Sequence, residues 1–259
     1  MDLIKHKLIE EFVLKQPLIE KEKSNKWSCI YTYGDDKDFI SSEHFAPIHA
    51  FRIFSKFEYP IYLFINFLKT GDLDVLLNRY PGIIVTTIEP LKNSFEYNYW
   101  FINKLWYMVD TEYVITCQND GFLLKSGYEG FIEENDFDYI GAVWKDEVKL
   151  HTKNFNLPPQ KIGNGGFSAR KPSKMREVLN LVNSAGGQDY IVEGQSNDGV
   201  KKLNHSRCAE DSFFANFGFG MNIFNPVTIE QANQFSLEPI PFDIIDTKDC
   251  PFGFHRCDN

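Results

Sequence analysis

Short apolar runs alternate with helix-like segments through the first half of the chain, and this alternation constrains the fold more than any other feature. The apolar runs are rich in β-branched and aromatic residues, as strands are, and occupy residues 27–33, 61–67, 83–88 and 113–117. Segments with helical spacing separate them at residues 42–57, 72–80 and 98–109. Strands and helices that alternate through short connections are typical of a parallel sheet covered by helices. We therefore predict an α/β fold with a mixed, mainly parallel sheet and helices on both faces.

Beyond residue 120 the alternation weakens, and the sequence predicts one further strand and one further helix. The strand covers residues 139–144, a polar loop follows it, and the helix covers residues 172–182. Residues 186–203 are rich in turn formers and show no clear period. We expect a loop there, either a flap that closes over a ligand or a mobile surface segment.

The stretch I-G-N-G-G-F-S-A-R at residues 162–170 holds three glycines within four residues. Backbone with so little side-chain cover allows close approach of a ligand or another segment, and it adopts φ > 0 at small steric cost. The glycines lie at positions 163, 165 and 166 without a following Lys-Ser or Lys-Thr, so they match neither a P-loop nor G-x-G-x-x-G. We expect this stretch to lie at the centre of the functional site.

Apolar residues at helical spacing over residues 2–15 predict an amphipathic helix, and Pro17 with the charged run 20–26 predicts a linker after it. The apolar face packs either on the rest of the chain, which is the commoner case, or on a partner or membrane. We divide the chain into an N-terminal helix and linker, residues 1–24, and a single domain, residues 25–259.

A net charge of -9 argues against nucleic acid as a partner, because phosphate binding needs a basic surface. No apolar run reaches the roughly 18 to 20 residues that span a bilayer, and the N-terminus is charged throughout. We therefore expect a cytoplasmic protein, with peripheral membrane association through the N-terminal helix as an open alternative. Cys29 and Cys117 lie in strand-like runs and are expected to be buried free thiols.

In open α/β sheets, ligands bind outside the carboxyl ends of the strands, so the residues that follow each apolar run are candidates for the site. Tyr33 ends the first run, and Asn119 and Asp120 follow the fourth. A carboxylate at such a position can hold a divalent cation together with phosphate oxygens. Alternatively, Asp120 only caps the segment that follows it.

Glu210 and Asp211 precede Phe213 and Phe214, which predicts that at least one of the two carboxylates lies beside apolar surface. Burial of that kind raises a carboxylate pKa toward the value that a general base needs. Asp211 is also suited to open a helix as its N-cap, and the two roles are compatible. His255, in the C-terminal sequence F-G-F-H, is by itself more often structural than a ligand.

A series of motifs from about residue 113 to residue 255 resembles an uncharacterised glycosyltransferase-like family of bacterial surface-polysaccharide clusters and fungi. The motifs are Y-V-I-T-C-Q-N-D-G-F, D-Y-I-G-A-V-W, G-N-G-G-F-S-A-R, E-D, F-S-L-E and F-G-F-H. The first 110 residues match only in the expected pattern of strands and helices. The resemblance implies a GT-A fold, a Rossmann-like sheet that binds a nucleotide-sugar donor.

The resemblance also implies a metal site. Asp120 would stand where GT-A enzymes place the last acid of a D-x-D motif, which holds Mn or Mg against the donor pyrophosphate, and His255 would complete that site. Gln118 stands where the first acid of the motif is usual. One carboxylate remains where two are common, so metal is expected to bind weakly or only with the nucleotide present.

The implied activity is transfer of a sugar from a nucleotide-sugar to a hydroxyl group of a glycan or lipid-linked glycan, in capsule, O-antigen or other surface polysaccharide synthesis. Asp211 would be the base of an inverting reaction, with Glu210 beside it. The candidate donor- and acceptor-binding residues are Tyr33, Asn119, Trp144, Asn164, Gly165 and Gly166. Trp144 is equally suited to the core.

Three alternatives stay open at this point. A retaining transferase is the nearest, because nothing in the sequence fixes the stereochemistry. A nucleotide-sugar hydrolase or phosphotransferase would use the same site. A non-catalytic carbohydrate-binding protein would have lost the first acid of D-x-D. The sequence specifies neither the base and sugar of the donor nor the acceptor.

Overall fold

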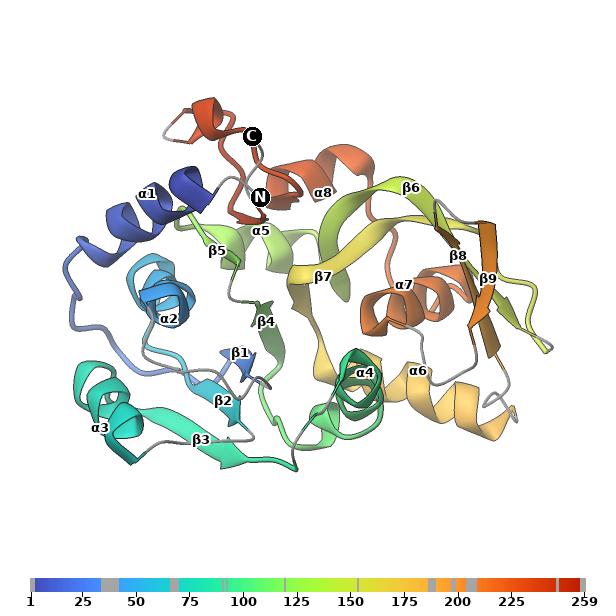
Figure 1. The fold of residues 1–259 in the computed structure, drawn as a ribbon, viewed down its shortest axis with the longest axis horizontal. Helices are drawn as coiled ribbons and strands as arrows, with labels where there is room; N and C mark the ends of the chain where they lie inside the picture. The colour runs from blue at the N-terminus through green and yellow to red at the C-terminus, as the bar shows by residue number, and fades with distance from the viewer. Residues whose placement is uncertain are drawn as a thin grey trace.

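In the computed structural model, eight strands of the described part of the chain form one central sheet (Figure 1). Their order is β3-β2-β1-β4-β7-β6-β8-β9, and a second sheet has the order β10-β11-β5. Apolar clusters cover both faces of the central sheet, so the predicted mixed α/β fold is confirmed. The structure describes residues 3–33, 42–65, 70–89, 91, 93–118, 120–152, 154–185, 190–196, 199–203, 209–245 and 247–256.

The first part of the chain builds the parallel half of the sheet, as predicted. It comprises β1 (Trp27–Tyr33), β2 (Ile61–Ile65), β3 (Ile83–Thr87) and β4 (Tyr113–Cys117). Cys29 of β1 pairs with Ile61 of β2 on one side and with Ile115 of β4 on the other, both in parallel register. The connecting helices α2 (Ser42–Phe54) and α3 (Thr70–Arg79) also lie where the apolar spacing places them.

The third connecting helix differs from its prediction. It was expected over residues 98–109, but α4 covers Ser94–Asn103 and a 3-10 turn follows at Leu105–Tyr107. The side chain of Asn93 accepts a hydrogen bond from the backbone of Glu96 at 3.0 Å, and this cap fixes the earlier start.

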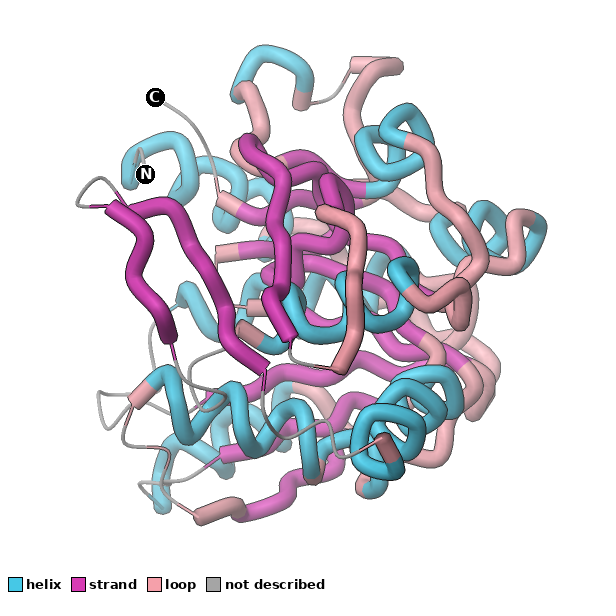
Figure 2. Tube along the Cα trace, turned by 90° about the vertical axis from the view of Figure 1, so that its right-hand side faces the viewer, coloured by secondary structure: helices cyan, strands magenta, loops and turns pink. Residues whose placement is uncertain are grey.

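The second part of the chain builds an antiparallel half, and two predictions there are wrong. β6 (Tyr139–Thr152) extends eight residues past the expected strand end, where a polar loop was predicted. Part of the expected loop at residues 186–203 is a hairpin of β8 (Tyr190–Ser196) and β9 (Gly199–Leu203). The hairpin lies at the right-hand end of the sheet in Figure 1, the side that faces the viewer in Figure 2. Residues 186–189 and 197–198 lie outside the described residues.

The glycine-rich stretch is also a strand. It belongs to β7 (Gln160–Arg170), which pairs antiparallel with β4 on one side and with β6 on the other. Every residue from 162 to 170 is buried. The stretch is therefore a central strand of the sheet, and the close approach that its glycines allow is made by other parts of the protein.

The small second sheet returns the C-terminal segment to the end of β4. β11 (Gly253–His255) lies between β5 (Gly121–Leu123), to which it is antiparallel, and β10 (Ser236–Leu237), to which it is parallel. His255 pairs with Gly121, and Phe254 pairs with Leu237. The register thus brings His255 next to the loop that carries Asp120.

Two apolar clusters form the core, one on each face of the central sheet, and neighbouring residues of β1 alternate between them. Helix α1 (Leu3–Leu14) packs against α2 and buries Ile9 and Val13, so its apolar face lies on the rest of the chain. Cys29 and Cys117 are buried free thiols, as predicted.

The remaining helices are α5 (Tyr128–Glu134), α6 (Pro172–Ser184), α7 (Glu210–Gly220), α8 (Ile229–Phe235) and a 3-10 turn at Phe242–Ile244. None of the described helices has the length and apolar composition needed to cross a membrane.

Candidate functional site

Two neighbouring glycines of β7 are the points at which charged groups from distant segments reach the central sheet. A Cβ atom on Gly165 would lie 2.8 Å from the Cβ of Asp211 and would also collide with the carboxylate of Glu210. A Cβ atom on Gly166 would fall on the imidazole ring of His255. Glycine is therefore required at both positions by side chains that pack against the strand.

On the Gly165 side, Arg170 and Glu210 form a buried ion pair. Arg170 Nη2 donates to Glu210 Oε1 at 2.9 Å, and Nη1 contacts Oε2, so the guanidinium binds both carboxylate oxygens. Arg170 Nε donates to Ser168 Oγ at 2.9 Å. Aromatic rings enclose the guanidinium, with centroids 4.6 Å away for Tyr139 and 5.0 Å for Phe101. We call these two residues the Arg170–Glu210 pair.

For each residue of this pair, burial disfavours the charged form and the charge of the partner favours it. Burial raises the pKa of Glu210 to about 7, and the charge of Arg170 counteracts this shift. Burial also disfavours the charged form of Arg170, but the Glu210 carboxylate outweighs it and raises the pKa of the guanidinium. Because both oxygens of Glu210 are bound to Arg170, Glu210 links the start of α7 to β7.

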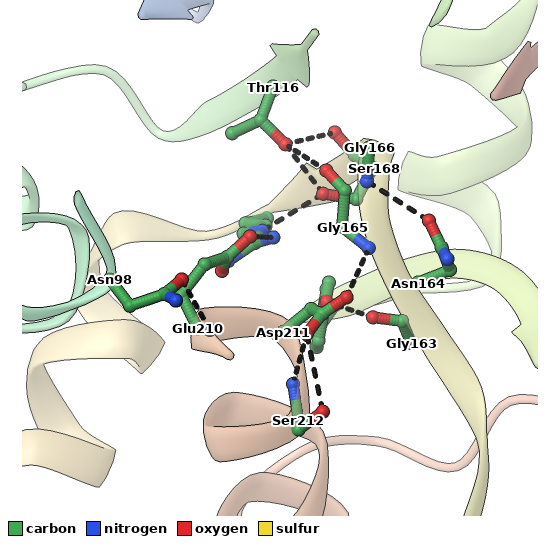
Figure 3. A network of polar contacts seen from close by, with 12 residues as sticks. Asn98, Thr116, Gly163, Asn164, Gly165, Gly166, Ser168, Glu210, Asp211 and Ser212 are labelled. Atoms are coloured by element: carbon green, nitrogen blue, oxygen red, sulfur yellow. Dashed lines mark hydrogen bonds and ion pairs between the residues drawn. The ribbon is translucent and has the colours of Figure 1, made fainter. Parts of the chain in front are cut away.

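Asp211 is held differently. Its Oδ2 accepts from the backbone N–H of Gly165 at 3.1 Å, and its Oδ1 accepts from the N–H of Ser212 at 2.6 Å (Figure 3). The side chain is half-buried, and burial raises its pKa although these donors oppose the rise. The N-cap position of α7 is Ala209, so Asp211 lies inside the first turn and is not the cap. It is a positioned carboxylate with the pKa direction that a general base needs.

On the Gly166 side, charged side chains meet beside the small sheet. We call these residues, Asp120, Glu238, His255 and Arg256, the Asp120–His255 cluster. His255 Nε2 lies 3.2 Å from Asp120 Oδ1, and His255 Nδ1 lies 3.1 Å from Glu238 Oε1. Arg256 approaches both carboxylates, at 3.7 Å from Asp120 and 3.6 Å from Glu238, while 59% of its side chain stays exposed. The imidazole is buried between two acids.

Electrostatics in this cluster favour a protonated histidine. Burial alone would lower the pKa of His255, but the carboxylates of Asp120 and Glu238 outweigh it and raise the pKa to about 9. Burial tends to raise the pKa of Asp120, but His255 and Arg256 lower it. Among the described residues, neither ring nitrogen of His255 finds a well-aligned hydrogen bond, despite these short distances.

His255 Nε2 and Asp120 Oδ1 could be two ligands of a divalent cation whose other ligands come from a bound molecule. Two ligands of one metal ion, each about 2 Å from it, lie roughly 3 Å apart, which is the separation of His255 Nε2 and Asp120 Oδ1. A cation between them would satisfy a buried nitrogen that lacks an aligned partner. Across the described part of the chain, no group of three or more His, Cys, Asp or Glu side chains is arranged to hold a metal. The remaining ligands would have to come from a bound molecule.

The other predicted residues lie around β7 or outside the described residues. Asn164 is buried, and its Oδ1 accepts from the N–H of Gly166 at 3.0 Å within the strand. Trp144 packs over Gly163, where an added Cβ would lie 3.1 Å from its ring. Tyr33 ends β1, but its side chain is not described, and Asn119 lies outside the described residues.

Two charged residues of the site had no predicted role. Arg170 ends the glycine-rich motif, and Glu238 ends the motif F-S-L-E, so both stood in quoted motifs. A charged residue at the end of an apolar strand pattern signals a buried ion pair or a ligand, and that signal was available from the sequence.

Comparisons with known proteins identify the fold. A family model described as "Protein of unknown function (DUF5672)" matches residues 83–255, and comparison with curated proteins found no match. Core-mannan synthase A from Aspergillus fumigatus, solved in a Mn/GDP form, is similar at a TM-score of 0.51 and 8% identity, over 76% of this chain and 70% of that chain.

Two further solved structures show lower similarity. Mouse xyloside xylosyltransferase 1 has a TM-score of 0.47 at 10% identity, over 92% of this chain and 97% of that chain. S. aureus TarS 1–349 has a TM-score of 0.46 at 10% identity over 89% of this chain, which spans only 60% of that structure's length. Identities this low establish the fold alone, and that fold is GT-A.

Proposed function

Since the chain belongs to the DUF5672 family of proteins of unknown function and has a GT-A fold, we propose that it is a glycosyltransferase using a nucleotide-sugar donor. The observation that carries the proposal is the convergence on Gly165 and Gly166. There a positioned carboxylate, Asp211, and a histidine–carboxylate cluster reach adjacent residues of one strand. The two glycines are consecutive residues of β7, so the Cα atoms beside which the proposed base and the proposed cation ligands pack are about 3.8 Å apart.

In this proposal Asp211 is the general base. The Gly165 and Ser212 donors fix its carboxylate, and burial supports a raised pKa that suits proton transfer near neutral pH. Asp211 takes the proton of the acceptor hydroxyl while the oxygen of that hydroxyl attacks the anomeric carbon from the face opposite the leaving group. The product then has inverted configuration. Glu210 keeps α7 in place through Arg170 and takes no part in proton transfer.

Asp120 and His255 would hold Mn or Mg, with the donor pyrophosphate as the source of the remaining ligands. The ion, when bound, neutralises the charge that develops on the departing nucleoside diphosphate. The structure of the mannan synthase in a Mn/GDP form supports testing this metal and a diphosphate nucleotide first.

The acceptor in this proposal is a glycan or lipid-linked glycan, and the setting is surface polysaccharide synthesis. This part rests on the resemblance of the motifs between residues 113 and 255. Trp144 and Asn164 lie beside the site and are the proposed acceptor- or sugar-facing residues.

The test is donor turnover by the purified chain. A panel of nucleotide-sugars with Mn is incubated with and without an acceptor mixture, and release of nucleoside diphosphate is followed. Asp211→Asn is expected to lower turnover by about 10² to 10⁴-fold while nucleotide binding is kept. Asp243→Asn, which changes an exposed acid in the same way, is the matched control and is expected to stay at the wild-type rate.

The outcomes separate the alternatives. Full activity of Asp211→Asn removes Asp211 as the base. Turnover that needs no acceptor favours a hydrolase, and a product of retained configuration removes the inverting mechanism. No turnover of any donor rejects the transferase proposal itself.

A further inference from the structure

Glu238 is a partly buried acid to which the proposed mechanism gives no role. The parallel register pairs Ser236 with Gly253 and Leu237 with Phe254, so the next residue on this side, Glu238, comes to lie beside His255. Its side chain is only 15% exposed, and its Oε1 lies 3.1 Å from His255 Nδ1. The strand pairing therefore holds this carboxylate against one specific nitrogen of the ring.

The imidazole of His255 has little freedom to turn. Its ring occupies the space that a side chain on Gly166 would need, and the residue is 5% exposed. Nε2 faces Asp120 while Nδ1 faces Glu238. The two nitrogens point away from each other, so Glu238 is not placed to share one ion with Nε2.

A neutral imidazole carries a single N–H, and a nitrogen that binds a metal must be the one without it. In the metal-free chain the ring is charged, so an ion that binds Nε2 takes the place of the Nε2 proton, and the remaining proton has to stay on Nδ1. A carboxylate that accepts this N–H fixes the tautomer, orients the ring and makes the other nitrogen a better ligand.

We propose that Glu238 is a positioning residue whose carboxylate, 3.1 Å from Nδ1, keeps the proton of His255 on that nitrogen and so leaves Nε2 free to bind a divalent cation with Asp120. This inference rests on the proposed function, because it assumes a cation at that site. Glu238 acts through His255 and touches neither the ion nor the substrate. It explains why an acid stands at the end of the motif F-S-L-E.

The experiment measures bound Mn²⁺ directly, by the electron paramagnetic resonance signal of the free ion, with saturating GDP or UDP and no sugar donor. The proteins are wild type, Glu238→Ala, Glu238→Gln and Asp120→Asn. Glu238→Ala is expected to weaken Mn²⁺ binding by about 10 to 100-fold. Glu238→Gln keeps an oxygen that accepts the same N–H, so it is expected to stay within a few-fold of wild type. Asp120→Asn loses a ligand and is expected to lose more than either.

Each of the other possible results rejects part of this proposal. If Glu238→Gln loses as much binding as Asp120→Asn, Glu238 is itself a ligand and the positioning role is wrong. If Glu238→Ala binds like wild type, the residue has no role at the ion. Both results leave the proposed function standing, whereas wild type that binds no Mn²⁺ with any nucleotide rejects the metal site and this inference together. Glu177→Gln, an exposed acid of α6, controls for the substitution, and far-UV circular dichroism of each variant checks its fold.

Discussion

The two charged clusters beside β7 differ in how completely hydrogen bonds within the chain satisfy their groups. In the Arg170–Glu210 pair, the guanidinium binds both oxygens of one carboxylate, and aromatic rings close over it. In the Asp120–His255 cluster, one imidazole lies between two carboxylates, its contacts are poorly aligned, and an exposed arginine approaches from outside. The first cluster has its charges satisfied within the chain, and the second has capacity left for a ligand. A buried charged group therefore indicates a ligand site only where hydrogen bonds within the chain leave it unsatisfied.

The largest effect is expected from breaking the Arg170–Glu210 pair. Glu210→Ala leaves a buried guanidinium without its partner, which should lower the free energy of unfolding by about 3 to 5 kcal/mol. Urea denaturation followed by circular dichroism measures this, with Asp243→Ala as a control expected within about 0.5 kcal/mol of wild type. A loss below about 1 kcal/mol for Glu210→Ala would show that the pair is not the closed cluster described above.

The next effect is a pH dependence that belongs to the Asp120–His255 cluster. The pKa of His255 is about 9 in the folded chain, above the usual 6.5, so its stabilising contribution is complete below about pH 6.5. That contribution is lost as the pH rises toward 9, and it is at most about 3 kcal/mol. Urea titrations of metal-free wild type and His255→Asn between pH 6 and 9 should converge at the upper end. Parallel curves would mean that His255 is not charged in the folded state.

A smaller effect is expected where the ring meets the strand. Gly166→Ala places a methyl group on the imidazole of His255, and such overpacking costs about 1 to 3 kcal/mol. The same substitution should weaken Mn²⁺ binding, because it moves a ligand. Gly130→Ala, at an exposed helical position where an added Cβ would make only an ordinary contact with Glu134 at 3.9 Å, is the matched control and should stabilise the chain by about 0.5 to 1 kcal/mol. Equal behaviour of the two variants in thermal melts would contradict the packing of His255 on β7.

The parallel half of the fold was predictable because its signals are local. Strands such as 61–65 are apolar runs, and the helices between them have their own spacing and stop signals. The candidate site residues Asp120 and Asp211 were also within reach, since acids at strand ends and before aromatics are visible in the sequence, whereas His255 was a candidate only through the resemblance.

In the antiparallel half the start of β6 and helix α6 were predicted, but most of its strands were not, for physical reasons that particular residues show. Gly165 and Gly166 weaken the strand pattern of β7, and the reason for glycine there is contact with α7 and His255, about 45 and 90 residues away. The roles of Arg170 and Glu238 likewise follow from partners that only the folded chain brings together. Sequence patterns reflect contacts between residues close in the chain, whereas the structure of this half depends on contacts between residues far apart in the chain.

The most direct test of the account is thermal stabilisation by nucleoside diphosphates, each with and without Mn²⁺, on wild type and Asp120→Ala. A ligand that binds only the folded chain adds RT ln(1 + [L]/Kd), about 2.7 kcal/mol at a hundred times Kd. We predict a rise in Tm that needs both Mn²⁺ and one class of nucleotide in wild type and is absent in Asp120→Ala. No shift with any nucleotide, or an equal shift in the variant, would contradict the claim that the Asp120–His255 cluster is the ligand site.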